Sequence, residues 1–310
     1  MSLMFHLALG DAYGAGREFA DPADVEANND GKTYVENPIH PNLKPGRYTD
    51  DTQESIAVAE WLLAGSPFNQ IEFADYLVKA FRRDPRPGYA TNFYNLLSQC
   101  DSGADLVYNI RSKSDRAGGA MRAPVCGLLQ TIDGVRDAAM FQASVTHATA
   151  DGMNAAAAAA LLVWACRHGQ RRETLPAFLN ETVGGYGWEE PWVGPVGNNG
   201  INAVRAALWA IVGDGVFMST ILKTCVANTG DVDTVAAIAM AAASMHPDII
   251  KDLDPALGRN LEGGRYGWRY LQSLDVRLAK AFMLGRKPVA VVIPDLPDIE
   301  GPIDILDLFP

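Results

Sequence analysis

Two short segments of this chain combine carboxylates with hydroxyl groups, each directly before a run of residues typical of a helix. Residues 48–52 read YTDDT and residues 230–234 read GDVDT. Carboxylate and hydroxyl oxygens are hard ligands that suit Mg²⁺ and Mn²⁺, whereas zinc sites are usually built from His and Cys. No His or Cys cluster in the sequence competes with this interpretation. Together the two segments could therefore hold a cluster of divalent cations.

Helix capping is an alternative explanation for both segments. Asp and Thr are favoured at helix N-termini, because their oxygens accept the free backbone N–H groups and carboxylates interact well with the helix dipole. Asp50 followed by Gln53 resembles a capping box. More than half of the chain separates the two segments, so the residue types alone leave both interpretations open.

Composition favours a globular protein and disfavours binding to nucleic acid or anionic membranes. The 310 residues are 48% hydrophobic and carry a formal net charge of -11, which repels polyanions. No apolar stretch reaches the length of a membrane span, and the first residues lack the basic start and cleavage site of a signal peptide. The four cysteines are far apart, so we expect no disulfide framework and a reducing, cytoplasmic location.

Signals for helices dominate the sequence. Helices are predicted where apolar residues recur with few β-branched residues, over residues 53–64, 71–83, 137–146, 153–168, 201–212, 216–227, 234–244 and 266–284. β-Branched residues predict a strand at 289–293, and glycine, proline and asparagine predict loops at 28–47 and 183–200. Because strands and helices do not alternate, we predict one all-α domain over residues 1–310, with the tail at 287–310 packed on its surface.

Further motifs, taken in chain order, resemble those of the ADP-ribosylglycohydrolase family, and the similarity covers nearly the whole chain. Besides YTDDT and GDVDT, they are LALGDAYGA at residues 7–15 followed by Glu18, GGAMR at 118–122, SVTH at 144–147 and LEGG at 261–264. The resemblance implies an orthogonal multi-helix bundle with a binuclear centre of two Mg²⁺ or Mn²⁺ ions. It also implies hydrolysis of the bond between C1 of an ADP-ribose ribose and an acceptor, such as a protein arginine.

The resemblance assigns roles to the acidic residues. Asp51, Asp231 and Glu18 are candidates for the acid and base of the reaction, and Asp233 is a candidate for a carboxylate that bridges both ions. Asp11 is expected to be buried and structural, since a buried carboxylate needs hydrogen-bond partners. The implied metal ligands are Thr49, Asp50, Asp51, Asp231, Asp233 and Thr234.

A glycine-rich segment and a histidine are implied to contact the substrate. They comprise Gly118, Gly119, Ala120, Met121 and His147. Small side chains let backbone amides approach a pyrophosphate, although the same segment could be an ordinary turn before a helix that starts near Met121. The sequence departs from the family here, with Ala117 where an asparagine is common, and Arg116 could reach a phosphate instead.

Four other positions carry open interpretations. Tyr186, Trp188 and Trp192 lie in the predicted loop 183–200. They could stack on the adenine or hold an acceptor, or they could anchor the loop on the core. Val232 replaces the threonine usual in the family, and we expect its side chain to point away from the metals.

The leading hypothesis from the sequence is a metal-dependent hydrolase that acts on an ADP-ribosylated protein or another ADP-ribosylated acceptor. The altered substrate segment motivates an alternative, an ADP-ribose-binding module that has lost the chemistry. A third hypothesis is a hydrolase of a different ADP-ribose-containing small molecule, since one site can serve several leaving groups. We expect no membrane and no stable nucleic-acid partner.

Overall fold

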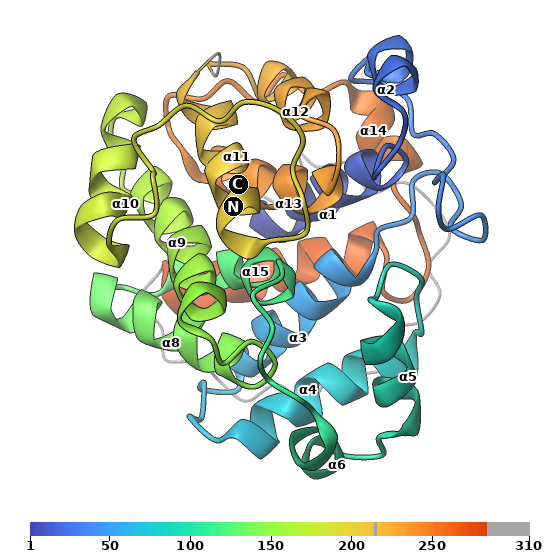
Figure 1. Cartoon of the computed structure of the whole chain (residues 1–310), viewed down its shortest axis with the longest axis vertical. Helices are drawn as coiled ribbons and strands as arrows, with labels where there is room; N and C mark the ends of the chain where they lie inside the picture. Colours follow the sequence, from blue (N-terminus) through green and yellow to red (C-terminus); the bar gives the residue numbers. More distant parts are fainter. Residues whose placement is uncertain (214–215, 284–310) are drawn as a thin grey trace.

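The computed structural model describes residues 1–213 and 216–283, which form an all-helical fold (Figure 1). Backbone pairing outside helices is confined, in this part of the chain, to isolated bridges. The α helices are α1 (Leu3–Ala15), α2 (Pro22–Asn28), α3 (Asp50–Leu63), α4 (Gln70–Arg83), α5 (Thr91–Gln99), α6 (Gly103–Asn109), α7 (Gly118–Met121), α8 (Ile132–Ser144), α9 (Ala150–Arg167), α10 (Leu175–Val183), α11 (Gly200–Val212), α12 (Met218–Ala227), α13 (Val232–Met245), α14 (Pro255–Asn260) and α15 (Trp268–Phe282). Two 3₁₀ helices, η1 (Ala123–Leu128) and η2 (Arg172–Thr174), complete the set. The predicted all-α fold class is confirmed.

Helix α13 lies in the middle of the fold and contacts helices α1, α3, α9, α11 and α12. All of its residues from Val232 to Ser244 are buried. A helix that is apolar on every side belongs in the interior of a protein. Alanine dominates α13 and α9, and such short side chains let neighbouring helix axes approach one another.

Two glycines of α1 allow this helix to lie directly against α13. A β-carbon at Gly10 would be 2.4 Å from the carbonyl oxygen of Ala236, and one at Gly14 would be 2.4 Å from the α-carbon of Asp233. Any larger residue would therefore separate the two helices. Their close approach places the C-terminal end of α1 beside the first turn of α13, where the second acidic segment lies.

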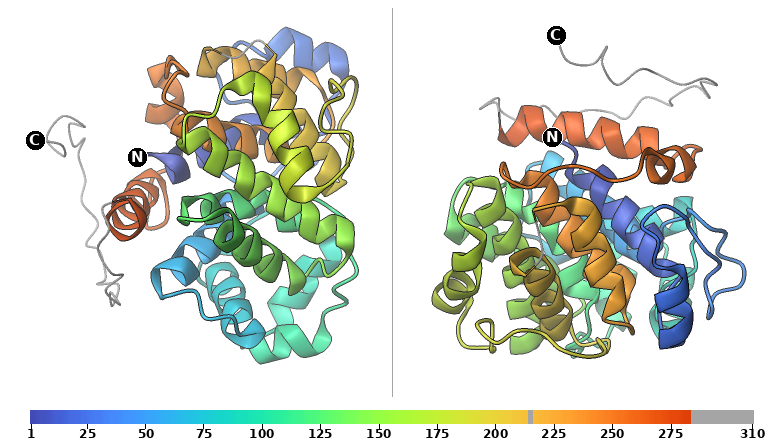
Figure 2. Two further views of the ribbon diagram at one scale, coloured as in Figure 1. Left: turned by 90° about the vertical axis from the view of Figure 1, so that its left-hand side faces the viewer. Right: turned by 90° about the horizontal axis from the view of Figure 1, so that it is seen from above.

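Helix α15 lies along one side of the molecule, against α1 and α3 (Figure 2). The buried carboxylate of Asp275 fastens it, because this group accepts hydrogen bonds from the N–H groups of Met4 and Phe5 at 2.9 and 3.1 Å. Both N–H groups belong to the first turn of α1, where backbone donors have no partner within the helix. The contact also matches a negative charge to the positive end of the helix dipole.

Most of the predicted helices are present, with shifted ends. Helix α3 begins at Asp50, three residues before the predicted start, and α15 ends at Phe282. Helix α8 begins at Ile132 instead of residue 137, because the hydroxyl of Thr131 caps it by accepting from Gly134 N–H. The loops at 28–47 and 183–200 are confirmed apart from their terminal residues.

One predicted helix start is wrong. Helix α7 ends at Met121, and the 3₁₀ helix η1 follows with Pro124 in its first turn, so no α helix starts near Met121. The helices α1, α2, α5, α6, α10 and α14 were not predicted. The predicted strand at 289–293, the tail at 287–310 and the end of the last predicted helix at 284 lie outside the described residues. Within the described residues, no helix has the length and apolar character needed to cross a membrane.

Candidate metal centre and substrate segment

The first acidic segment, residues 48–52, opens helix α3 and is held by Asp11 of helix α1. The fully buried carboxylate of Asp11 accepts hydrogen bonds from the N–H and the hydroxyl of Thr49 at 2.9–3.0 Å. It also accepts from the N–H and the hydroxyl of Thr52, at 3.0 and 2.5 Å. Thr49 is at the same time the N-cap of α3, since its hydroxyl accepts from Asp51 N–H. Capping therefore does not exclude a role for this segment in a metal site.

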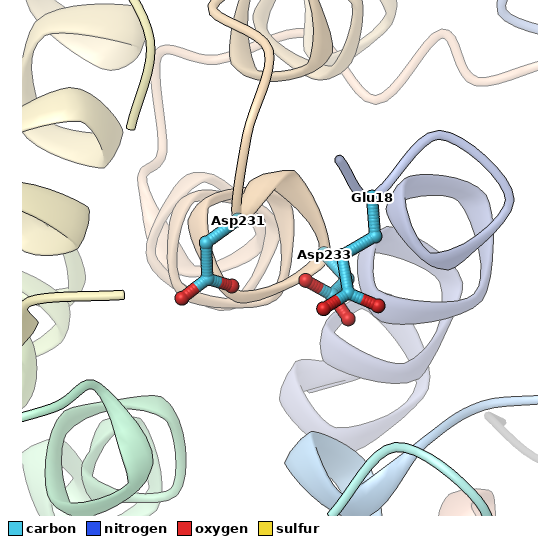
Figure 3. A group of neighbouring side chains, drawn as sticks. All are labelled: Glu18, Asp231 and Asp233. Carbon is cyan, nitrogen blue, oxygen red and sulfur yellow. The ribbon is translucent and has the colours of Figure 1, made fainter. Parts of the chain in front are cut away.

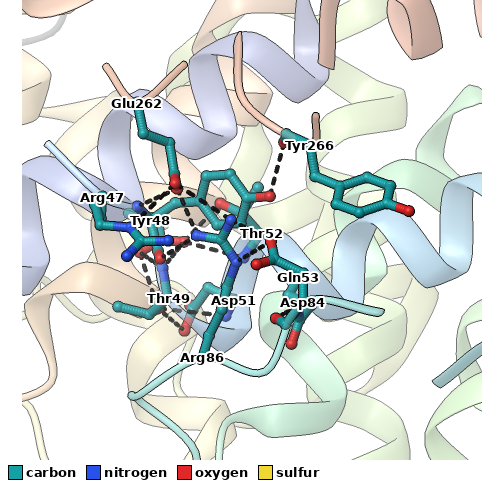
Figure 4. Close-up of polar contacts among 11 residues, drawn as sticks. Arg47, Tyr48, Thr49, Asp51, Thr52, Gln53, Asp84, Arg86, Glu262 and Tyr266 are labelled. Atoms are coloured by element: carbon teal, nitrogen blue, oxygen red, sulfur yellow. Dashed lines mark hydrogen bonds and ion pairs between the residues drawn. The ribbon is translucent and has the colours of Figure 1, made fainter. Parts of the chain in front are cut away.

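Tyr48, the first residue of this segment, is held by three hydrogen bonds and one cation–π contact (Figure 4). Its N–H donates to Glu262 Oε1 at 3.1 Å, and its carbonyl accepts from Arg86 Nη1 at 3.1 Å. Arg86 and Glu262 form a buried ion pair at 2.5 Å, and the guanidinium lies 3.6 Å from the centre of the Tyr48 ring. The Tyr48 hydroxyl donates to the carbonyl of Tyr266 at 2.8 Å. We call Arg86 and Glu262 the Tyr48 clamp.

The second acidic segment, residues 230–234, opens helix α13 and is held by backbone contacts. Asp231 N–H donates to the carbonyl of Val196, and Val196 N–H donates to the carbonyl of Thr229, both at 2.9 Å. Thr229 and Gly230 have positive φ values of 61° and 89°. A β-carbon at Gly230 would be 1.9 Å from the Val196 oxygen, so only glycine fits. The carbonyl of Gly230 accepts from Phe19 N–H at 2.8 Å, which fixes the turn after α1.

Three carboxylates meet where this turn reaches helix α13 (Figure 3). One oxygen from each of Glu18, Asp231 and Asp233 lies within 4.8 Å of the others, in a group that could hold a metal ion. In the part of the chain that the structure describes, the buried Oε2 of Glu18 and Oδ1 of Asp51 have no hydrogen-bond partner. Buried carboxylate oxygens in native proteins are normally paired, so these atoms point to an absent cationic partner.

The pKa values of the acidic side chains are raised. Burial, reinforced by the negative charge of Asp233, raises the pKa of Glu18 to about 9. Burial also raises the pKa of Asp11 and of Asp231 to about 6, against the opposing effect of hydrogen bonds from Thr49 and Thr52 in the case of Asp11. Burial and a neighbouring negative charge both disfavour the charged form of a carboxylate.

The two acidic segments lie within electrostatic reach of each other. The pKa values of Asp50, Asp51 and Asp233 are all raised well above the ordinary range, first by burial and then by neighbouring carboxylates. The charge of Asp233 contributes to the raised pKa of Asp50 and is the leading electrostatic contribution for Asp51. Both segments also contact helix α1, the first through Asp11 and the second at Gly14.

The donor set of this cluster fits divalent cations. It consists of carboxylate and hydroxyl oxygens, the ligands preferred by Mg²⁺ and Mn²⁺. Among the described residues, no Lys or Arg forms an ion pair with Glu18, Asp50, Asp51, Asp231 or Asp233. A bound divalent cation would offset both the burial of these charges and their mutual repulsion.

The GGAM segment, residues 118–121, forms the short helix α7. The N–H groups of Ala120 and Met121 donate to the carbonyl of Ala117 at 2.8 and 2.9 Å, and both side chains are buried. For the N–H groups of Gly118 and Gly119, no acceptor is found among the described residues. The two glycines are therefore the members of this segment whose amides remain able to bind a ligand.

The imidazole of His147 lies against this segment. A β-carbon at Gly118 would be 2.9 Å from Cε1 and 3.2 Å from Nε2 of His147. Ala117 is buried, and its N–H donates to the carbonyl of Asn198 at 3.0 Å, which joins the GGAM segment to the loop that also holds Gly230. The neighbouring Arg116 is exposed.

The three aromatic residues of the loop before α11 differ in their surroundings. Trp188 is fully buried and its Nε1 donates to the carbonyl of Gly184, which supports the anchoring interpretation. Trp192 Nε1 donates to the carbonyl of Gly194 and its ring packs on the core. The hydroxyl of Tyr186 accepts from Asn154. Val232 is fully buried.

Sequence reasoning missed the residues that hold the candidate site in place. Glu262 was recognised only as part of the LEGG motif, and Arg86 was not among the predicted residues. Gln142 was not considered, although its Nε2 donates to the carbonyl of Gly119 at 2.8 Å. Glu262 and Arg86 are distinguished by their pairing as buried opposite charges, and a single sequence does not show which charges pair.

The sequence of this chain is similar to a protein-family model and to several curated proteins. A family model described as ADP-ribosylglycohydrolase matches residues 3–246. The chain is 33% identical over 147 residues to ADP-ribosylhydrolase ARH3 from Gallus gallus, a match that covers 44% of this chain and 39% of that protein. It is 28% identical over 190 residues to ADP-ribosylhydrolase ARH3 from Bos taurus, covering 57% of this chain and 51% of that protein. The chain thus spans about half or less of the length of these curated relatives.

A solved structure agrees on the fold. The structure titled "ADP-ribosylglycohydrolase-related protein complex" has a TM-score of 0.65 and 23% identity, covering 90% of this chain and 96% of that chain. The likeness extends over nearly all of the helical architecture described above. Since the family model matches well over half of its residues, the chain belongs to the ADP-ribosylglycohydrolase family.

Proposed function

We propose that this chain is a divalent-metal-dependent hydrolase that cleaves the bond between C1 of an ADP-ribose ribose and an acceptor, releasing ADP-ribose. The observation that carries the proposal is the group of Glu18 and the buried Asp231 and Asp233, whose oxygens converge without a basic partner in the described residues. Family membership supplies the substrate class. The activity itself is inferred from this combination.

The two acidic segments would hold two Mg²⁺ or Mn²⁺ ions. When bound, such ions act as Lewis acids toward water and toward the ribose hydroxyls. Asp233 is the proposed bridging carboxylate, because its charge reaches both Asp231 and Asp51. The proposed ligands are Thr49, Asp50, Asp51, Asp231, Asp233 and Thr234, and the position of Glu18 adds it as a further candidate.

Asp51, Asp231 and Glu18 are the proposed acid and base groups. Glycosidic cleavage passes through an oxocarbenium-like transition state, in which the attacking water loses a proton and the leaving acceptor gains one. In the metal-free protein, Glu18 is suited to hold a proton near neutral pH, because burial raises its pKa to about 9. The remaining negative charge stabilises the positive charge that develops at C1.

The GGAM segment and His147 are the proposed substrate contacts. The amides of Gly118 and Gly119 can donate to a pyrophosphate, since the N–H groups of Ala120 and Met121 are already used. Ala120 and Met121 would shape the segment from within the core. His147, next to Gly118, would face the same ligand.

A protein side chain such as arginine is the proposed acceptor, and the chain is proposed to act as a single domain in the cytoplasm. The test is to incubate the protein with ADP-ribosylated arginine, serine and nucleic-acid acceptors and to measure free ADP-ribose. Release should require Mg²⁺ or Mn²⁺ and stop when a chelator is added. Asp233→Asn should lower the rate at least about 100-fold, whereas Glu60→Gln, which alters a buried carboxylate away from the cluster, should retain activity.

An ADP-ribose-binding module without activity is the second candidate. It is favoured by Ala117, which is buried where the family commonly has an asparagine. Calorimetric titration with ADP-ribose distinguishes the two proposals. Binding by the wild type without release from any acceptor would support the binding module and contradict the hydrolase.

A further inference from the structure

A buried chain of hydrogen bonds runs from helix α3 to His147. Arg122, fully buried, donates through Nη1 to Glu54 Oε2 at 2.6 Å and through Nη2 to the hydroxyl oxygen of Thr146 at 2.7 Å. Its remaining bonds go to the side chain and the carbonyl of Gln142. The Thr146 oxygen lies 2.6 Å from Nδ1 of His147. Glu54 is thereby connected to the imidazole through two intermediate side chains.

The direction of each bond in this chain follows from its donors. A guanidinium can only donate, so the Thr146 oxygen accepts from Arg122. The Thr146 hydroxyl proton then needs an acceptor of its own, and among the described residues His147 Nδ1 is the one within hydrogen-bond distance. Nδ1 must therefore carry a lone pair. A neutral imidazole with a lone pair on Nδ1 has its proton on Nε2.

The opposite tautomer has a definite cost. If Nδ1 carried the proton and donated to Thr146, the buried Thr146 hydroxyl proton would have no acceptor in the described part of the chain. An unsatisfied buried donor costs on the order of the full desolvation of that group. The positively charged form of His147 is disfavoured as well, because burial and the nearby charge of Arg122 lower the pKa of His147 to about 3.

We propose that Arg122 and Thr146 are positioning residues that lock His147 as the Nε2–H tautomer. In this tautomer the Nε2–H is the donor for the contact of His147 with ADP-ribose that is proposed above. The second statement rests on the proposed function, whereas the first does not. Gly118 has a specific part in this arrangement, since a β-carbon there would press on Cε1 and Nε2 of His147. A glycine leaves that edge of the ring open to a ligand.

The tautomer is tested on the ligand-free protein by nitrogen-15 NMR of the histidine side chains. The signals of His147 are identified among those of the five histidines by their loss in His147→Gln. Wild-type His147 should show an unprotonated Nδ1 and a protonated Nε2, without change between pH 8 and pH 5. A protonated Nδ1, in either the other tautomer or the cation, would overturn the proposal.

A matched pair of variants tests the role of Thr146. Thr146→Ser keeps the hydroxyl and should keep the wild-type tautomer, whereas Thr146→Val has nearly the same shape without a hydroxyl and should yield a mixture of tautomers. An unchanged spectrum in Thr146→Val would remove Thr146 from the proposal. Arg122→Lys tests the other positioning residue in the same way. It should also yield a mixture of tautomers, because a lysine cannot reach Glu54, Gln142 and Thr146 with one planar group.

Calorimetric titration with ADP-ribose tests the ligand contact. His147→Phe should weaken binding about tenfold, the equivalent of one lost hydrogen bond. His147→Gln, whose amide can place a donor near the original Nε2, should recover part of the loss. Equal affinity of His147→Phe and wild type would overturn the contact. If the wild type bound no ADP-ribose, the contact and the proposed function would both fail, while the NMR result would still decide the tautomer.

Discussion

The two acidic segments both contact helix α1 but are held in place by different means. The first is held by charged side chains, namely Asp11 beneath Thr49 and Thr52 and the Tyr48 clamp of Arg86 and Glu262. The second is held by backbone. Its contacts are the paired N–H and carbonyl groups around Val196 and the close approach of α1 to α13.

The difference suggests a division of tasks. A segment held by backbone hydrogen bonds and glycine conformation has few alternative positions, because each change meets a steric barrier. A segment held by ion pairs and a buried carboxylate depends on groups that must remain charged or paired. Damage to the second segment should therefore affect folding first, whereas damage to the first should be visible in metal affinity.

Gly230→Ala should have the largest effect and should act on folding. The new β-carbon would lie 1.9 Å from the Val196 oxygen, at a residue with a φ of 89°. Strain and overpacking together should lower the free energy of unfolding by about 3 kcal/mol or more, measured by urea denaturation. Gly65→Ala is the matched control, with a φ of 99° and no atom within 4 Å of the added carbon. Equal losses in both variants would show that the contact with Val196 is unimportant.

Asp11→Ala should have the next largest effect and should act on both stability and metal binding. It leaves the buried N–H groups of Thr49 and Thr52 without their acceptor, which should cost about 2–3 kcal/mol. Loosening of this turn should also weaken Mg²⁺ or Mn²⁺ binding in calorimetry.

The matched control for Asp11→Ala is Asp275→Ala. That change also removes an acceptor from two backbone N–H groups, those of Met4 and Phe5, but it lies outside the cluster. A comparable loss of stability with unchanged metal affinity is expected. If Asp275→Ala weakened metal binding as much as Asp11→Ala, the proposed role of Asp11 in placing the first segment would be wrong.

The helices that the sequence revealed are those with clear composition or clear ends. Helix α9 has six consecutive alanines and ends before Gly169, and both features predicted the helix from the sequence. Helix α1 was missed because it is buried on nearly all sides and therefore lacks a polar face with helical spacing. Helices α2, α6 and α14 have six or seven residues, too few for a periodic pattern to emerge.

The residues of the candidate site were easier to predict than their arrangement. Asp50, Asp51, Asp231 and Asp233 were recognisable by type and by motif. Their convergence depends on Gly10 and Gly14, which bring α1 to α13, and on ion pairs such as that of Arg86 with Glu262. These partners are separated by more than 170 positions in the latter case, and no local pattern links them.

Glu262→Gln should weaken metal binding by about fivefold to tenfold with a smaller loss of stability. It removes the negative charge from the Tyr48 clamp, and among the described residues Arg86 then keeps Asp84 alone as an ionic partner. The expected result is a higher dissociation constant for Mn²⁺ in calorimetry.

Glu60→Gln is the control for the clamp. Glu60 also forms a buried pair with an arginine, Arg83 at 2.7 Å, but at the other end of α3 from Thr49. It should lower stability and leave the Mn²⁺ affinity unchanged. A similar loss of affinity in both variants would mean that the Glu60–Arg83 pair has the same influence as the Tyr48 clamp, and the clamp would have no special role.

Glu18→Gln should change the stability of the metal-free protein mainly through its pH dependence. Because the pKa of Glu18 is raised from 4.5 to about 9, the folded state keeps a proton that the unfolded chain releases. This contribution to stability is complete below about pH 4.5 and is lost as the pH rises toward 9, with at most about 1.4 kcal/mol per pH unit for one proton. Chelated wild type should thus become less stable from pH 5 to pH 9, and Glu18→Gln should show a shallower decline.

The exposed Glu189 provides the control for this last comparison, because Glu189→Gln should reproduce the wild-type pH profile. Saturating Mg²⁺ should stabilise the wild type most at high pH, where the carboxylates are charged and the repulsion that the cation offsets is greatest. Parallel pH profiles for chelated wild type and Glu18→Gln would place Glu18 outside the cluster. The candidate metal site at the start of α13 would then depend on Asp231 and Asp233 alone, which belong to the segment that is held by backbone contacts.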